Sequence, residues 1–192
     1  MLKQTRQIGL LLLAILGVIG GPFAIAEDAA EFKETYNANA IALGKGLTSN
    51  LQITITRWTT PEERNALLTT LVEKGQEEMI KVLKKQKETG FLRLPNTMGY
   101  SLYYAWEVKK EGGKRRILLA TDRPVAMAEA WHGTRSMDYA VAMVELMLDE
   151  QNRGDGALMF AVKLKANQET KTLEVENYGT DPVQLRNVRK SD

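Results

Sequence analysis

The residues best suited to chemistry lie together in one polar segment, residues 121–138, which reads TDRPVAMAEAWHGTRSMD. Connections of this length and polarity carry functional residues more often than the elements that they join. The segment contains two arginines, a tryptophan, the only histidine of the chain and several carboxylates. From it we take six candidate ligand-binding residues: Asp122, Arg123, Trp131, His132, Arg135 and Asp138.

A binding role and a structural role both fit these side chains. In a binding site, Arg123 and Arg135 would grip an anionic group, and Trp131 would stack on the apolar part of the same ligand. In a structural role, Asp122 with Arg123 and Arg135 with Asp138 would form ion pairs, while Trp131 would cover the end of a sheet. The pattern leaves both alternatives open, and it also leaves open whether residues 125–131 form a short helix or a strand.

An enzymatic role would give the task of general base to His132, with Asp122 or Asp138 as its partner. The rest of the chain offers little for catalysis. One histidine and no cysteine leave no His/Cys metal cluster, and the sequence contains no GxSxG turn, glycine-rich phosphate loop or HExxH motif. We therefore predict no catalytic residue, no metal site and no cofactor, and a hydrolase using His132 is the least favoured reading.

The N-terminus has the pattern of a secretory signal. Two basic residues precede the apolar run Ile8–Ile19, which is too short to span a bilayer comfortably, and a Gly-Gly-Pro break follows it. The small residues Ala24 and Ala26 then occupy the positions that a signal peptidase reads. We predict a signal peptide over residues 1–26, with an uncleaved anchor as the alternative, and a single α+β domain over residues 27–192.

The charge balance argues against a nucleic-acid partner. The chain has 26 Lys and Arg against 24 Asp and Glu, and the predicted signal contains two of the basic residues and no acidic one. The exported part is therefore close to neutral and lacks the basic excess of nucleic-acid-binding domains. We predict a periplasmic or secreted protein without a stable membrane span after signal cleavage, whose partner is a small molecule or an envelope protein.

Alternating apolar residues predict an antiparallel sheet. The last four strands are expected to form a meander, and residues 139–148 are apolar on both faces, which is typical of a central strand. In the strand over residues 99–108, strict alternation places Leu102 on one face with Tyr104, Trp106 and Val108. The nine expected strands cover residues 36–43, 51–58, 91–94, 99–108, 115–121, 139–148, 157–165, 172–178 and 183–188.

A helical hairpin is predicted after the second strand. Thr60, Pro61 and Glu63 form a capping box with proline at the first helical position, and apolar residues then recur at helical spacing. We expect two helices, over residues 61–74 and 76–87, although one helix with an interior glycine is an alternative. The predicted fold is α+β: a curved antiparallel sheet or partial β-barrel of about eight or nine strands, against which the hairpin packs its apolar stripe.

Three stretches resemble a group of uncharacterised secreted bacterial proteins: RRILLATDRP (Arg115–Pro124), RSMDY (Arg135–Tyr139) and VQLRNVR (Val183–Arg189). The resemblance implies a bacterial exported protein of unknown role, and no catalytic residue carries over from it. Our first hypothesis is therefore a non-catalytic domain that binds a small amphipathic or anionic ligand in a cavity between helices and sheet. The alternative is an envelope protein that acts in protein–protein interaction or assembly.

Overall fold

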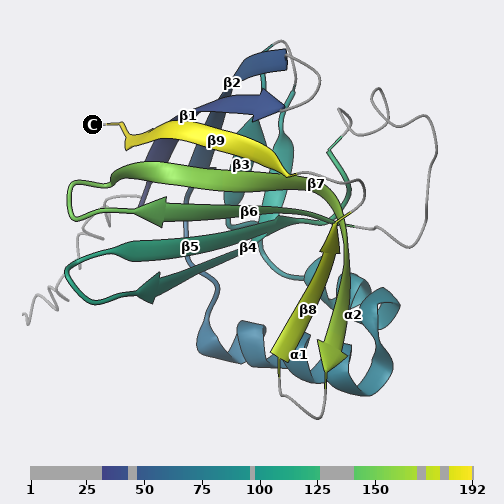
Figure 1. The fold of residues 1–192 in the computed structure, drawn as a ribbon. Coiled ribbons are helices and arrows are strands. Elements are labelled where there is room, and N and C mark those ends of the chain that lie inside the picture. The colour runs from purple at the N-terminus through teal and green to yellow at the C-terminus, as the bar shows by residue number, and fades with distance from the viewer. Residues whose placement is uncertain are drawn as a thin grey trace, which may run out of the picture. The chain divides into compact units, whose positions relative to one another are not determined.

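Antiparallel strands that close into a barrel dominate the computed structural model (Figure 1). The structure describes residues 32–42, 47–95, 98–125, 141–167, 172–177 and 182–191. The predicted signal peptide and most of the predicted site segment lie outside these ranges. The described elements are β1 (Glu34–Ala42), β2 (Leu47–Ile55), α1 (Pro61–Lys74), α2 (Gln76–Leu83), β3 (Gly90–Arg93), β4 (Tyr100–Lys109), β5 (Arg115–Thr121), β6 (Val141–Leu148), β7 (Arg153–Asn167), β8 (Thr172–Asn177) and β9 (Val183–Lys190).

The barrel closes because β7 pairs with β6 as well as with β9. Among the described strands the order is β6-β5-β4-β3-β2-β1-β9-β7-β8, and the additional β6–β7 pairing closes a ring of eight strands that leaves β8 outside. Every pairing is antiparallel. The predicted α+β class, the antiparallel sheet and the position of the helices after the second strand are confirmed, and the barrel is closed where the sequence suggested a partial one.

The predicted meander is wrong at its last strand. β9 pairs with β1 and with the first half of β7, whereas β8 pairs with the second half of β7, over residues 162–167. The physical reason is burial, because Val183, Leu185 and Val188 of β9 fill the barrel interior and are at most 4% exposed. β8 therefore stands outside the ring, and with the second half of β7 it extends toward the helices (Figure 1).

Inward-facing residues fill the barrel, and a second apolar cluster lies between its outer wall and the helices. β6 contributes to both, as its double apolar face predicts: Val144 and Leu146 point into the barrel, while Val141 and Met143 lie beneath the helices. Farther along the outer face of β6, Glu145 is half-buried and Met147 is 50% exposed.

A bulge in β4 overturns the predicted faces of that strand. The register with β5 shifts between Leu102 and Tyr104. Leu102 and Ala105, which strict alternation puts on opposite faces, are consequently both fully buried in the barrel interior. Tyr104 and Trp106 turn to the outer wall, because one extra residue in a strand reverses the facing of everything after it.

A charged network closes one end of the barrel around Arg115. Its guanidinium donates to Glu107 Oε1 at 2.8 Å, to Glu34 Oε2 at 3.0 Å and to the Tyr36 hydroxyl at 3.1 Å. The Tyr36 hydroxyl donates in turn to Glu34 Oε2, and Lys190 Nζ donates to Glu34 Oε1, both at 2.8 Å. Burial raises the pKa of the Glu34 carboxyl, but the hydrogen bonds from Lys190, Tyr36 and Arg115 together lower it below its ordinary value of 4.5.

This network makes stability depend on pH in the acid range. Because the pKa of Glu34 is lower in the folded than in the unfolded chain, its contribution is complete above about pH 4.5 and is lost as pH falls through the folded-state pKa. We expect Glu34→Gln to lower the free energy of unfolding by about 2 kcal/mol near neutral pH, and the difference from wild type to shrink below pH 4.5. Urea unfolding across this range measures it. Glu111→Gln, in an exposed turn, is the control, and a difference that stays constant with pH would contradict the assignment.

Candidate ligand-binding site

The structure describes two of the six predicted site residues. Asp122 is half-buried, and Arg123 is exposed with its guanidinium carbon 5.5 Å from the centre of the Tyr100 ring. Trp131, His132, Arg135 and Asp138 lie outside the described residues, so the proposed cluster stays a prediction.

The predicted site segment starts at the barrel end opposite Arg115. The buried Thr121 hydroxyl accepts a hydrogen bond from the Ala142 amide at 2.9 Å and donates to the Arg123 carbonyl at 2.5 Å. Two residues later, Val125 is fully buried in the barrel core, and its amide donates to the Phe160 carbonyl at 3.1 Å. The first residues of the segment are therefore fixed by hydrogen bonds of the Thr121 hydroxyl, by the backbone hydrogen bond of Val125, and by burial.

A small apolar cavity lies where the helical hairpin covers the outer wall of the barrel. Its volume is about 90 Å³, and its walls come from α1, α2 and strands β4 to β7. The helices supply Leu67, Leu68, Leu71, Met79 and Leu83, and the strands supply Leu118, Ala120, Val141, Met143 and Leu164. Here the apolar side chains of the hairpin face Ala120. Because the alanine side chain is small, a space remains between the helices and the barrel. Among the described residues, the polar side chains of the lining are Arg64 and Tyr104.

Arg64 and Tyr104 place one charge and one hydroxyl at this otherwise apolar cavity. The Arg64 guanidinium carbon lies 5.0 Å from the centre of the Trp106 ring, which holds it by a cation–π contact. Burial raises the pKa of the Tyr104 hydroxyl, and the charge and hydrogen bond of Arg64 offset part of that rise. The hydroxyl therefore stays protonated at neutral pH, and the two groups offer N–H and O–H donors beside an apolar wall.

The start of α1, which positions Arg64, is fixed as the sequence predicts. The Glu63 amide donates to Thr60 Oγ1 at 3.2 Å, and the Thr60 amide donates to Glu63 Oε2 at 2.9 Å, so the capping box is present with Pro61 in the first turn. α1 ends at Lys74 as predicted, whereas α2 ends at Leu83, four residues before the predicted end.

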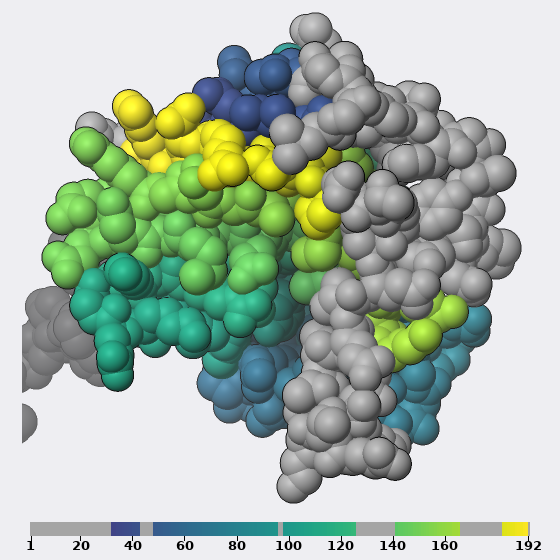
Figure 2. Space-filling view, in the orientation of Figure 1, coloured from purple at the N-terminus to yellow at the C-terminus, as the bar shows by residue number. Residues whose placement is uncertain are grey.

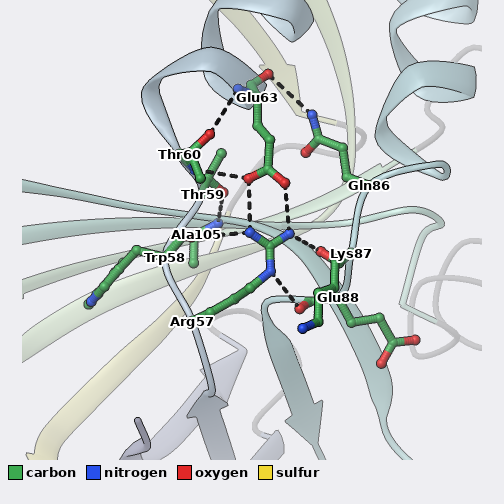
Figure 3. A network of polar contacts seen from close by, with 9 residues as sticks. All are labelled: Arg57, Trp58, Thr59, Thr60, Glu63, Gln86, Lys87, Glu88 and Ala105. Carbon is green, nitrogen blue, oxygen red and sulfur yellow. Dashed lines mark hydrogen bonds and ion pairs between the residues drawn. The ribbon is translucent and has the colours of Figure 1, made fainter. Parts of the chain in front are cut away.

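Arg57 joins the two ends of the hairpin to the barrel (Figure 3). Its guanidinium donates to both carboxylate oxygens of Glu63, at 2.8 and 3.1 Å, and also to the carbonyls of Lys87 and Glu88 beyond α2. Gln86 Nε2 adds a hydrogen bond to the Glu63 carbonyl at 3.1 Å. The hydrogen bonds from Arg57 hold the pKa of the Glu63 carboxyl below its ordinary value, so this bidentate ion pair persists at neutral pH.

At its other end the hairpin contacts the second half of β7. The Leu164 amide donates to Oε1 of Gln76, the first residue of α2. Figure 1 shows β8 and this part of β7 reaching the helices. The hairpin is thus held by polar contacts at both ends and by apolar contacts between them, which is the arrangement of a cover over a cavity.

Sequence reasoning missed Arg64 and Tyr104 as site residues. A signal was present, since Arg64 lies three and seven residues before Leu67 and Leu71 and so shares their helix face. For Tyr104 the bulge in β4 obscured which face it occupies. The cavity depends on how the hairpin fits the outer wall of the barrel, and no local sequence pattern predicts that fit.

Comparison of the chain with protein-family models, with curated proteins and with solved structures gives no match. Within the described ranges, no helix has both the length and the apolar character that a membrane span requires. In the same part of the chain, no group of three or more His, Cys, Asp or Glu side chains is arranged to hold a metal ion.

Proposed function

We propose that this chain is an exported, non-catalytic domain that binds a small amphipathic anion in the cavity between the helical hairpin and the barrel. The observation that carries the proposal is a space lined by apolar side chains with one guanidinium at its wall. Binding sites for small molecules typically combine such an apolar lining with a few placed polar groups. The export signal predicted over residues 1–26 belongs to the proposal.

The chemistry of the lining defines the ligand. A carboxylate or a similar anion would accept hydrogen bonds from Arg64 and Tyr104, which both act as donors. An apolar tail would take the space among Leu67, Leu71 and Met143. A cavity of about 90 Å³ is smaller than the ~150 Å³ apolar cavity that accepts benzene, so a chain of a few carbons fits without movement of the helices.

Short straight-chain carboxylates provide the test, with hexanoate as the anionic probe and 1-hexanol as its uncharged counterpart. We expect hexanoate to raise the melting temperature more than hexanol, because only hexanoate pairs with Arg64. Arg64→Gln is expected to weaken hexanoate binding about tenfold in calorimetry and to remove the preference over hexanol. Ala120→Leu is expected to abolish binding of both probes, because the larger side chain occupies the cavity.

Two control variants distinguish loss of binding at the cavity from general effects of substitution on the protein. Arg116→Gln removes a guanidinium from the outer wall that pairs with Glu145, and Ala66→Leu enlarges an exposed residue of α1. Both should bind hexanoate as wild type does. Unchanged binding in Ala120→Leu would exclude the cavity as the site. Native mass spectrometry of protein purified without organic additives would then show whether any small molecule stays bound elsewhere.

A protein partner in the envelope is the second candidate, and β8 favours it. This strand pairs with β7 on one side, and no described strand pairs with its other side. An unpaired strand edge is a template for adding a strand from another chain. A stable protein partner recovered from envelope extracts, with no small molecule in the purified domain, would support this candidate over the first.

A further inference from the structure

A polar band crosses five neighbouring strands on the outside of the barrel. The registers place Arg153 of β7 opposite Arg189 of β9, Arg189 beside Asn37 of β1, Asn37 opposite Gln52 of β2, and Gln52 opposite Arg93 of β3. We call these five residues the arginine–amide row. Gln52 is half-buried and the other four are exposed.

The row lies on the wall of the barrel away from the helices. The inward neighbours Tyr36 and Ala38 are buried, and the helices cover the wall around β6 and the later part of β7 instead. Figure 2 shows β9, in yellow, at the surface between β1 and β7. A second set of polar residues runs alongside, where Asn39 pairs with Asn50 on one side and with Arg186 on the other.

Two arginines of the row, Arg153 and Arg189, lie directly opposite each other on neighbouring strands. Like charges directly opposite each other on neighbouring strands are destabilising. Neither Arg153 nor Arg189 forms a side-chain ion pair within the described residues, whereas Arg186 nearby pairs with Asp155 at 2.8 Å. An anion that sits between the two guanidinium groups would turn this repulsion into attraction.

The amides are equally hard to explain by folding alone. Asparagine is depleted in strands, because its side chain competes for backbone hydrogen bonds. The row and its neighbour nevertheless carry Asn37, Asn39, Asn50 and Gln52 at consecutive cross-strand positions. These residues and the flanking Arg93 and Arg189 line a shallow hollow of about 520 Å³. Asn37 Nδ2 donates to Ser191 Oγ at 2.6 Å, and this hydrogen bond does not use the Asn37 side-chain oxygen.

We propose that the arginine–amide row binds a linear acidic polysaccharide, with uronic-acid carboxylates on the arginines and sugar hydroxyls on the amides. Guanidinium groups bind carboxylates in a bidentate manner, and an amide both donates and accepts, as a hydroxyl requires. Arg93 and Arg189 lie three strands apart, roughly 14 Å along the sheet, so two carboxylates of one extended chain are held with neutral groups between them.

Other macromolecules fit this surface less well. A peptide cannot add as a strand here, because β1, β2, β3 and β9 are each paired on both sides. Single-stranded nucleic acid binds through aromatic platforms for its bases, and the ring of Phe91 beside the row is already contacted by Arg93 at 5.2 Å. The row and the apolar cavity lie on different walls of the barrel, and a ligand at one does not require a ligand at the other.

Fluorescence anisotropy with a labelled linear oligogalacturonate tests the proposal, with a neutral galacto-oligosaccharide, oligo-dT and a poly-glutamate peptide as alternatives. Wild type should bind the oligogalacturonate and bind more weakly as salt is added. The double variant Arg153→Gln/Arg189→Gln should bind about tenfold more weakly, and Gln52→Ala should bind more weakly than wild type. Arg116→Gln, on another wall, is the control and should bind as wild type.

Stability separates a binding role from a structural one. Because the double variant relieves a like-charge contact, it should unfold at the same temperature as wild type or higher, with the largest gain at low salt. A lower melting temperature would show that the arginines serve the fold and would overturn the proposal. No oligogalacturonate binding by wild type, or equal binding by the double variant, would also overturn it, as would tighter binding of oligo-dT or poly-glutamate.

Discussion

Replacement of Arg115 by methionine is expected to lower the free energy of unfolding by about 3–5 kcal/mol, because it leaves carboxylates without their partner in a mostly buried site. The Arg115 side chain is 16% exposed, and its carboxylate partners Glu34 and Glu107 are 11% and 20% exposed. Methionine retains most of the apolar stem of arginine, so the loss mainly reports the missing donors rather than a large cavity. Urea unfolding at neutral pH measures it.

A neighbouring ion pair provides the control for this prediction. Arg116 donates to Glu145 at 2.5 Å, but its side chain is 40% exposed on the outer wall. Water screens such a pair, so Arg116→Met should cost at most about 1 kcal/mol. Arg115→Lys keeps the charge but loses the planar guanidinium group. Its loss of unfolding free energy should lie between those of the two methionine variants. Equal losses at positions 115 and 116 would refute the view that the end of the barrel depends on a buried network.

Gly90→Ala should destabilise the chain by about 3 kcal/mol or more, because the site combines a rare backbone conformation with a close approach of another strand. Gly90 has φ +148°, and a Cβ built there would lie 1.9 Å from the Thr54 carbonyl oxygen of β2. That oxygen belongs to the backbone, so the overlap forces β2 and β3 apart at the point where the chain returns from the helices to the barrel. Pulse proteolysis and urea unfolding measure the loss.

Gly112→Ala separates the two causes. Gly112 also has positive φ, +66°, but a Cβ at this position meets no atom within 4 Å. We expect a loss of about 1 kcal/mol there, from backbone strain alone. Similar losses at both glycines would mean that the contact with Thr54 is relieved by a small backbone shift.

Local signals predicted much of the fold. The capping box around Thr60 and the alternation in β6 depend on neighbours in sequence, and the structure confirms the helix start and the two apolar faces of β6. Long-range pairing was harder to predict. The position of β9 beside β1 is decided by which strands fill the barrel interior, and the facing of Tyr104 is decided by one bulge in β4.

The site was predicted less well than the fold. The site prediction relied on residue types that often bind ligands, and these are concentrated around Trp131 and His132. That segment lies outside the described residues. The cavity beside Arg64 arises from leucine, methionine and alanine side chains, which by themselves look like ordinary core. The arginine–amide row is also invisible in the linear sequence, because it joins single residues from five strands.

The route of the chain through Arg57 has a consequence for how this architecture can change. The Thr56 amide donates to the Thr89 carbonyl at 2.9 Å, so the segment that contains both helices leaves and rejoins the barrel at a single point. Ring closure needs nothing from that segment. The two helices can thus be lengthened or exchanged without breaking the ring, provided that the replacement still covers the apolar wall beneath them.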